Sequence, residues 1–183
     1  SPAAVSGLLA TDPSNGAYEF HGGSTERLEC GNMTVSGTAL TVEAWFEDPD
    51  YPATSASWET IGGTHNLTLR TYQGNLQFVV RAGSAASTAS VPLGSGGPHH
   101  AVGVYQSGAM RLYLDGVLVA TASRSGTVAA TQPVWIGSGS VNNWPINATV
   151  DEFAIYHSAL TEAQVQEHFQ AGAGAPSIVS DSY

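Results

Sequence analysis

The chain has 183 residues and a formal net charge of −10, and all five of its basic residues are arginine. Hydrophobic residues make up 42% of the sequence and charged residues 11%, which suits a single domain with a sizeable core. The acidic balance opposes binding to nucleic acid, and no apolar stretch is long enough for insertion into a membrane, so we exclude both.

Short runs of alternating hydrophobicity follow one another along the chain and are separated by turn signals, among them predicted hairpin turns at QGN (73–75) and at Asp115-Gly116. This spacing is typical of an antiparallel β-sandwich. The predicted strands are AYEFHG (17–22), RLEC (27–30), LTVEAWFED (40–48), NLTLRTY (66–72), LQFVVRA (76–82), HHAVGVYQ (99–106), MRLYLDG (110–116), VLVATAS (117–123), PVWIGS (133–138) and ATVDEFAIYH (148–157). In LTVEAWFED, alternation puts Trp45 on one face and four apolar residues on the other: Leu40, Val42, Ala44 and Phe46.

One segment near the end predicts a helix. Thr161 is a suitable N-cap, Gln164 completes a capping box, and Gly172 is expected to end the helix. We expect this helix to lie against the sandwich and to plug one open end with Val165 and Phe169.

Cys30 is the single cysteine, so the chain has no internal disulfide. Leu28 and Cys30 would share one face of a strand, and we therefore expect a buried, inert thiol.

Four blocks of the sequence resemble one family. TVEAWFEDP (41–49) is similar to the T-V-E-A-W strand of concanavalin A-like domains of the laminin-G-like and pentraxin-like kind. The blocks at 18–31, 98–123 and 135–172 resemble that family's opening strand, its central hairpin and its closing strand with helix. The resemblance implies an all-β fold, an antiparallel two-sheet jelly-roll sandwich with one short C-terminal helix, over 17–174. Residues 1–16 would be a lead-in and 175–183 a tail or linker.

The same resemblance implies a calcium ion where the first and last strands meet. Transferred to this sequence, the ligands would be the carbonyl of Gly22 and the carboxylates of Glu26 and Asp151. His21 stands where the family has an aspartate, which removes one hard ligand. The alternative is that one of Asp151 and Glu152, which point to opposite faces of the strand, is buried and hydrogen-bonded to turn amides while the other is solvated.

Glycosidases of this fold work with a pair of carboxylates, and alternating acidic residues on one concave strand would supply them. The sequence has no such E-x-D-x-E run, so hydrolysis is disfavoured. A zinc site is also disfavoured, because His99 and His100 are adjacent in a strand and point to opposite faces. We expect each histidine to be exposed or partly packed.

Exposed aromatic rings in turn-rich segments are candidates for stacking on the apolar faces of sugars. Tyr51, Trp58 and Trp144 lie in such segments, and Asn142 and Asn143 offer amide groups for hydroxyl recognition. The alternative for Trp144 is packing over an edge of the sandwich. The other two tryptophans fall within predicted strands and are expected to be packed: Trp45 and Trp135.

The sequence therefore predicts a non-catalytic, lectin-like adhesion module that recognises surface glycans. It would belong to a larger extracellular or virion protein, such as a phage tail or capsid appendage, and would contact neighbouring domains or subunits. The alternative is a structural or assembly domain without a sugar ligand. A glycoside hydrolase is the least favoured class, and calcium is the one expected cofactor.

Overall fold

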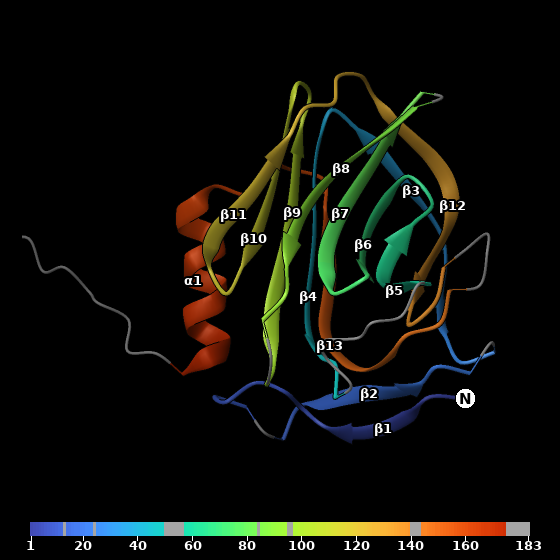
Figure 1. Ribbon diagram of the computed structural model, residues 1–183, viewed down its shortest axis with the longest axis vertical. Coiled ribbons are helices and arrows are strands. Elements are labelled where there is room, and N and C mark those ends of the chain that lie inside the picture. The colour runs from blue at the N-terminus through green and yellow to red at the C-terminus, as the bar shows by residue number, and fades with distance from the viewer. Residues whose placement is uncertain are drawn as a thin grey trace, which may run out of the picture.

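The computed structural model describes residues 1–12, 14–23, 25–49, 57–83, 85–94, 97–139 and 144–174, and of 130–132 the backbone alone. Two antiparallel sheets face each other, and a single helix within these ranges lies outside them, beside β10 and β11 at the left of Figure 1. The predicted jelly-roll sandwich with a short C-terminal helix is confirmed. Within these ranges no helix has the length and apolar character needed to span a bilayer.

The larger sheet has seven strands in the order β1-β2-β13-β4-β9-β10-β11. Their bounds are β1 Ala3–Ser6, β2 Gly16–His21, β4 Ala39–Glu47, β9 His99–Gln106, β10 Ala109–Leu114, β11 Val117–Ala122 and β13 Asn147–Tyr156. The smaller sheet has six strands in the order β3-β12-β5-β6-β7-β8. Their bounds are β3 Leu28–Gly37, β5 Trp58–Thr64, β6 Leu67–Tyr72, β7 Asn75–Ala82, β8 Ala85–Pro92 and β12 Val128–Ile136.

The main core fills the space between the sheets, because each strand turns alternate residues inward. Inward residues from both sheets are fully buried, among them Phe20, Leu40, Phe46, Leu69 and Phe78. The predicted face of β4 is confirmed, since its four apolar residues all belong to this core.

Tight turns join consecutive strands where the sequence predicts them. Asp115 and Gly116 both have positive φ, 52° and 78°, between β10 and β11. Gln73 and Gly74 repeat this pattern between β6 and β7, with φ of 47° and 74°. Two successive positive φ values match the twist of the flanking strands, so these turns set the hairpin registers.

Helix α1, Glu162–Ala173, packs on the outer face of the seven-stranded sheet. Its Val165 is fully buried with Leu160 against residues of β9 and β10, which form a second, smaller core: Val102, Val104 and Tyr113. The predicted plug at an open end is therefore wrong. The helix covers a sheet face because the outward residues of β9 and β10 are themselves apolar.

The start of the helix is the predicted one, whereas its end is not. The capping box between Thr161 and Gln164 is confirmed. The predicted stop at Gly172 is wrong, because the C-cap is Gly174, with φ 70°. A Cβ on Gly172 would lie 2.5 Å from Cζ2 of Trp45, so close packing and not helix termination requires glycine there.

Three other expectations differ from the structure. Cys30 is exposed and not buried, because β3 is an edge strand that carries one extra residue between the pairs Pro133–Asn32 and Trp135–Glu29. The sequence did not predict β5 or β8 as strands. The predicted lead-in contributes β1, which pairs with β2, while the predicted tail at 175–183 lies outside the described residues.

Candidate functional site

Two of the predicted ligand-binding residues, Trp58 and Trp144, lie against each other. Their ring centroids are 4.6 Å apart and their planes meet at 67°, an edge-to-face contact. Thr60 donates its backbone N–H to the carbonyl of Trp144 at 3.0 Å, which ties Trp144 to β5. Tyr72, the partner of Trp58 in the β5–β6 register, adds a third ring at 5.5 Å. The result is a cluster of three aromatic rings, in which Trp58 is 37% exposed.

Strand alternation puts this cluster on the outer face of the six-stranded sheet. In β6, Leu67 and Leu69 point into the core, so Arg70 and Tyr72, which alternate with them, point to the outer face of the sheet. Arg70 lies on the outer side, with its Cζ 4.8 Å from the centre of the Trp58 ring, a cation–π contact. The aromatic cluster and this arginine therefore form one continuous surface.

Among the described residues that line the space beside the cluster, Arg70 and Arg81 carry positive charge. Arg70 is 8% exposed, and burial, together with the nearby charge of Arg81, lowers its pKa to about 10. Its Nε donates to Oε1 of Gln77 at 2.9 Å, while Nη1 of Arg81 donates to the carbonyl of His65 at 2.8 Å. Burial and then the charge of Arg81 lower the pKa of His65, so the neutral imidazole is favoured there.

A small cavity of about 20 Å³ lies between the arginines and Trp144. Its lining consists of Thr60, Gly63, Thr64, His65, Thr68, Arg70, Arg81, Ser138, Gly139 and Trp144. No aspartate or glutamate is among these described residues. Thr60 is 2% exposed, and within the described part of the chain its hydroxyl has no hydrogen-bond partner. The cavity can therefore accept one polar atom of a ligand.

The other predicted ligand-binding residues, Tyr51, Asn142 and Asn143, lie outside the described residues. Of the two tryptophans expected to be packed, Trp45 is 6% and Trp135 is 8% exposed, so that prediction is confirmed.

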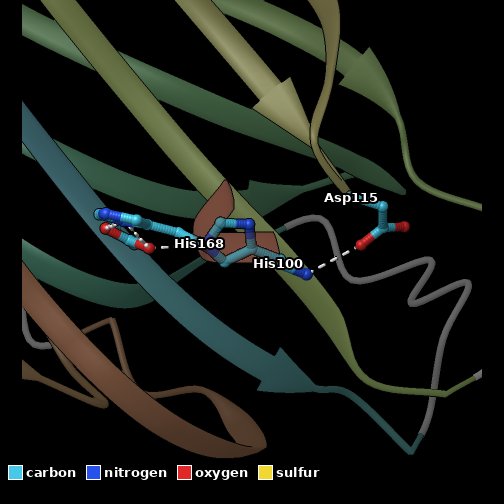
Figure 2. A network of polar contacts seen from close by, with 4 residues as sticks. His100, Asp115 and His168 are labelled. Atoms are coloured by element: carbon cyan, nitrogen blue, oxygen red, sulfur yellow. Dashed lines mark hydrogen bonds and ion pairs between the residues drawn. The ribbon is translucent and has the colours of Figure 1, made fainter. Parts of the chain in front are cut away.

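A second polar cluster, missed at the level of sequence, lies between β4, β9 and α1. Nε2 of His100 lies 2.7 Å from Oε1 of Glu43, and Nδ1 of His168 lies 3.1 Å from both oxygens of the same carboxylate. Figure 2 shows His100 and His168 converging on this carboxylate, with Asp115 beyond His100, where its Oδ1 accepts the backbone N–H of His100 at 2.8 Å. The side chain of His100 is fully buried. The expectation that each histidine is exposed or partly packed is therefore wrong for this one.

This cluster fastens the helix to the sheet. Thr41, Glu43 and Trp45 are the outward residues of β4, and each contacts the closing segment. The hydroxyl of Thr41 donates to the carbonyl of Ser158 and accepts the N–H of Leu160. The Trp45 ring stacks on that of Phe169 with centroids 5.8 Å apart. Alternation within TVEAW could have revealed the shared face, but not the partners, which lie more than a hundred residues later in the chain.

The structure separates the residues of the predicted calcium site. Gly22 donates its N–H to the carbonyl of Ile146, which directly precedes β13. Asp151 follows Ile146 by five residues, and five residues of extended strand span about 16 Å. Oδ2 of Asp151 accepts the N–H of Leu8 at 2.9 Å, which ties the N-terminal segment to the sheet. This is the alternative role considered for Asp151, and the three residues do not fit one coordination sphere.

Glu26 is the third predicted calcium ligand and lies in the segment after β2. Its carboxylate accepts the backbone N–H of His21 at 2.6 Å. This hydrogen bond is the main cause that lowers the pKa of Glu26. Among the residues that the structure describes, no group of three acidic, histidine or cysteine side chains could hold a metal. Calcium binding stays a prediction without a defined ligand set.

Comparison with known proteins decides the family. The profile of the concanavalin A-like lectin/glucanases superfamily matches residues 21–166. The chain belongs to this family. The resemblance found in the four sequence blocks is thereby confirmed. No curated protein sequence matches this concanavalin A-like chain.

Several solved structures share the concanavalin A-like fold. The binding domain of Paraclostridial Mosquitocidal Protein 1 superposes with a TM-score of 0.75 at 15% identity, over 92% of this chain and 45% of that one. Domain 4 of AbnA, an extracellular arabinanase from Geobacillus stearothermophilus in complex with arabinotriose, gives 0.69 at 18% identity, over 91% and 80%. Mouse laminin alpha1 domains LG4-5 give 0.61 at 16%, over 79% and 42%. The chain thus spans less than half of two of these three, and identities this low show the fold alone.

Proposed function

We propose that this protein is a non-catalytic glycan-binding module whose saccharide lies over Trp58, Trp144 and Tyr72. The observation that carries the proposal is the contact between the rings of Trp58 and Trp144, which come from distant segments of the chain. Trp58 is 37% exposed, and the contact lies beside a cavity lined by polar residues. Sugars present apolar C–H faces that stack on such rings, while their hydroxyl groups need polar partners at the rim.

The printed names of the structural neighbours support a binding role. One neighbour is a binding domain of a mosquitocidal protein, and another is a domain of an extracellular arabinanase in complex with arabinotriose. By analogy, this chain would be part of a larger protein that acts outside the cell or on a virion surface, such as a phage tail or capsid appendage. Neighbouring domains or subunits of that protein would be further partners.

The chemistry of the cavity supports a role without catalysis. Glycoside hydrolysis needs two carboxylates that flank the scissile bond. The described residues around the aromatic cluster supply arginines, threonines and a histidine, but no acidic side chain lines the cavity. A saccharide held there would meet no acidic side chain among the described residues that line the cavity, so we infer that it is bound and released unchanged.

Binding is tested on a broad glycan array, followed by titration calorimetry with the best ligand. We expect Trp58→Ala and Trp144→Ala each to weaken binding at least about tenfold, because roughly 1.4 kcal/mol of stacking is lost. Tyr18→Ala is the matched control, since Tyr18 is an aromatic residue on the other sheet that is 42% exposed.

Three outcomes would count against the proposal. A blank array together with stable self-association would favour the assembly domain. Unchanged affinity in both tryptophan variants would move the ligand elsewhere. Sustained release of reducing sugar by the pure protein would make it an enzyme.

A further inference from the structure

The distribution of positive charge on this acidic chain is uneven. The sequence holds 15 acidic residues and five arginines, yet two of the five arginines line one cavity that is free of aspartate and glutamate among its described residues. Arg70 and Arg81 come from the neighbouring strands β6 and β7. Since two like charges repel each other in a partly buried place, this arrangement costs free energy unless an anion joins it.

Arg70 and Arg81 keep N–H donors that the other residues described by the structure do not use. A guanidinium group has five N–H donors, and the hydrogen bonds that hold these two go from Nε of Arg70 and Nη1 of Arg81 to the neutral oxygens of Gln77 and His65. Arg81 places a second positive charge near Arg70, and among the described residues Tyr72 is the group that offsets it. A carboxylate or sulfate would meet the fork of N–H groups with charge-assisted hydrogen bonds.

Thr60 supplies an independent observation that points into the same cavity. Its hydroxyl is buried and has no hydrogen-bond partner among the described residues, and it lines the cavity with both arginines. A Cβ on Gly139 would lie 3.2 Å from this hydroxyl, so glycine keeps the approach to it open. The volume of about 20 Å³ suits one oxygen atom of a ligand group.

We propose that the saccharide bound on the aromatic cluster is an acidic one, whose carboxylate or sulfate group is held by Arg70, Arg81 and the hydroxyl of Thr60. This inference rests on the proposed glycan-binding function and adds the chemical class of the ligand. The sugar ring lies on the exposed part of Trp58, and Arg70 lies over the same indole ring with its Cζ 4.8 Å from the centroid, so stacking and charge recognition act on neighbouring parts of one ligand.

The rest of the surface makes this recognition short-ranged. With a net charge of −10 the protein repels an acidic polymer at a distance, and attraction begins only when the charged group reaches the arginines. At the usual ionic strength of about 0.15 M, charges are screened beyond about 8 Å, which removes most of the long-range repulsion but leaves the contact itself.

The test compares matched ligands by titration calorimetry: oligogalacturonate against its methyl ester, and a sulfated galactan oligosaccharide against its desulfated form. We expect at least one charged ligand to bind tenfold or more tightly than its neutral counterpart, and the preferred pair identifies carboxylate or sulfate. Arg81→Gln is expected to abolish that preference, because the affinity for the charged ligand falls to that for its neutral counterpart. Arg111→Gln on β10 of the other sheet is the matched control and should retain it.

The more buried arginine is tested separately. Arg70→Lys keeps a positive charge but loses the planar set of guanidinium N–H donors. It is therefore expected to reduce the preference for the charged ligand. Melting curves confirm that each variant is folded. Equal affinity for charged and neutral ligands, with both arginine variants unaffected, overturns this inference and leaves glycan binding intact. Binding to neither member of any pair, with a blank glycan array, overturns the proposed function as well.

Discussion

Replacing Glu43 with alanine would remove the carboxylate that joins the helix to the seven-stranded sheet. Oε1 of Glu43 lies 2.7 Å from Nε2 of His100, whose side chain is fully buried, and both carboxylate oxygens lie 3.1 Å from Nδ1 of His168. Hydrogen bonds to a charged group contribute about 1.5–3 kcal/mol each when buried. The His168 side chain is 36% exposed, so solvent screening lowers its share to about 1 kcal/mol.

We therefore expect Glu43→Ala to lower the free energy of unfolding by about 3 kcal/mol. In a domain of this size 1 kcal/mol shifts the melting temperature by about 2–4 °C, so the midpoint should fall by about 6–12 °C. Thermal unfolding followed by near-UV circular dichroism measures this, because Trp45 and Phe169 stack beside the cluster and report on its packing. Glu167→Ala, at an exposed position of the same helix, is the matched control and should change the midpoint little.

The same contact predicts a dependence on pH. Burial by itself raises the pKa of Glu43, but the hydrogen bonds and charges of His100 and His168 outweigh it, so its pKa lies below the ordinary value of 4.5. The unfolded chain then takes up a proton at higher pH than the folded chain does. The stabilisation is fully present above 4.5 and is lost as the pH falls through the lower folded value. The stability difference between the parent protein and Glu43→Gln should accordingly shrink in acid.

Two results would refute this reasoning about the helix. Loss of less than about 0.5 kcal/mol in Glu43→Ala would mean that apolar contacts alone hold the helix in place. A stability difference between the parent protein and Glu43→Gln that stays constant from neutral pH to pH values well below 4.5 would mean that the carboxylate is not charged in the folded state.

Three further predictions concern packing, capping and calcium. Gly103→Ala should destabilise the protein by about 1–3 kcal/mol in denaturant unfolding, because the added Cβ would lie 2.3 Å from the Phe78 ring. Gly94→Ala is the control, because a Cβ there meets open space. Equal effects of the two substitutions would contradict the packing argument. Thr161→Ala should cost about 1 kcal/mol through loss of the capping box, whereas Thr161→Ser should not; similar losses in both would exclude the cap as the cause. Calcium at 100 times its dissociation constant would raise the unfolding free energy by about 2.7 kcal/mol, and coincident melting curves with calcium and with chelator would rule out a bound ion.

The sequence by itself determined the kind of fold, because that depends on local order. Alternation over 40–48 identified β4 and its buried face, and Asp115-Gly116 identified a hairpin turn, since two positive φ values suit few other residue pairs. Thr161 and Gln164 marked the start of the helix for the same reason: the atoms that cap it lie within one turn of chain. Trp58 and Trp144 could be selected as candidates from their turn-rich surroundings, and the structure brings the two rings into contact, while their role in binding stays a prediction.

The tertiary structure alone decided which distant residues meet. Alternation shows that Glu43 and Trp45 share a face of β4, but only the path of the chain brings His168 and Phe169 to that face. The register between β2 and β13 likewise places Gly22 beside Ile146, so that Asp151 lies five residues, or about 16 Å of extended strand, further along the chain. Burial of His100 and the cavity beside Thr60 depend on side chains supplied by several strands at once. A local pattern specifies the direction in which a side chain points, whereas its partner is set by how the two sheets and the helix pack together.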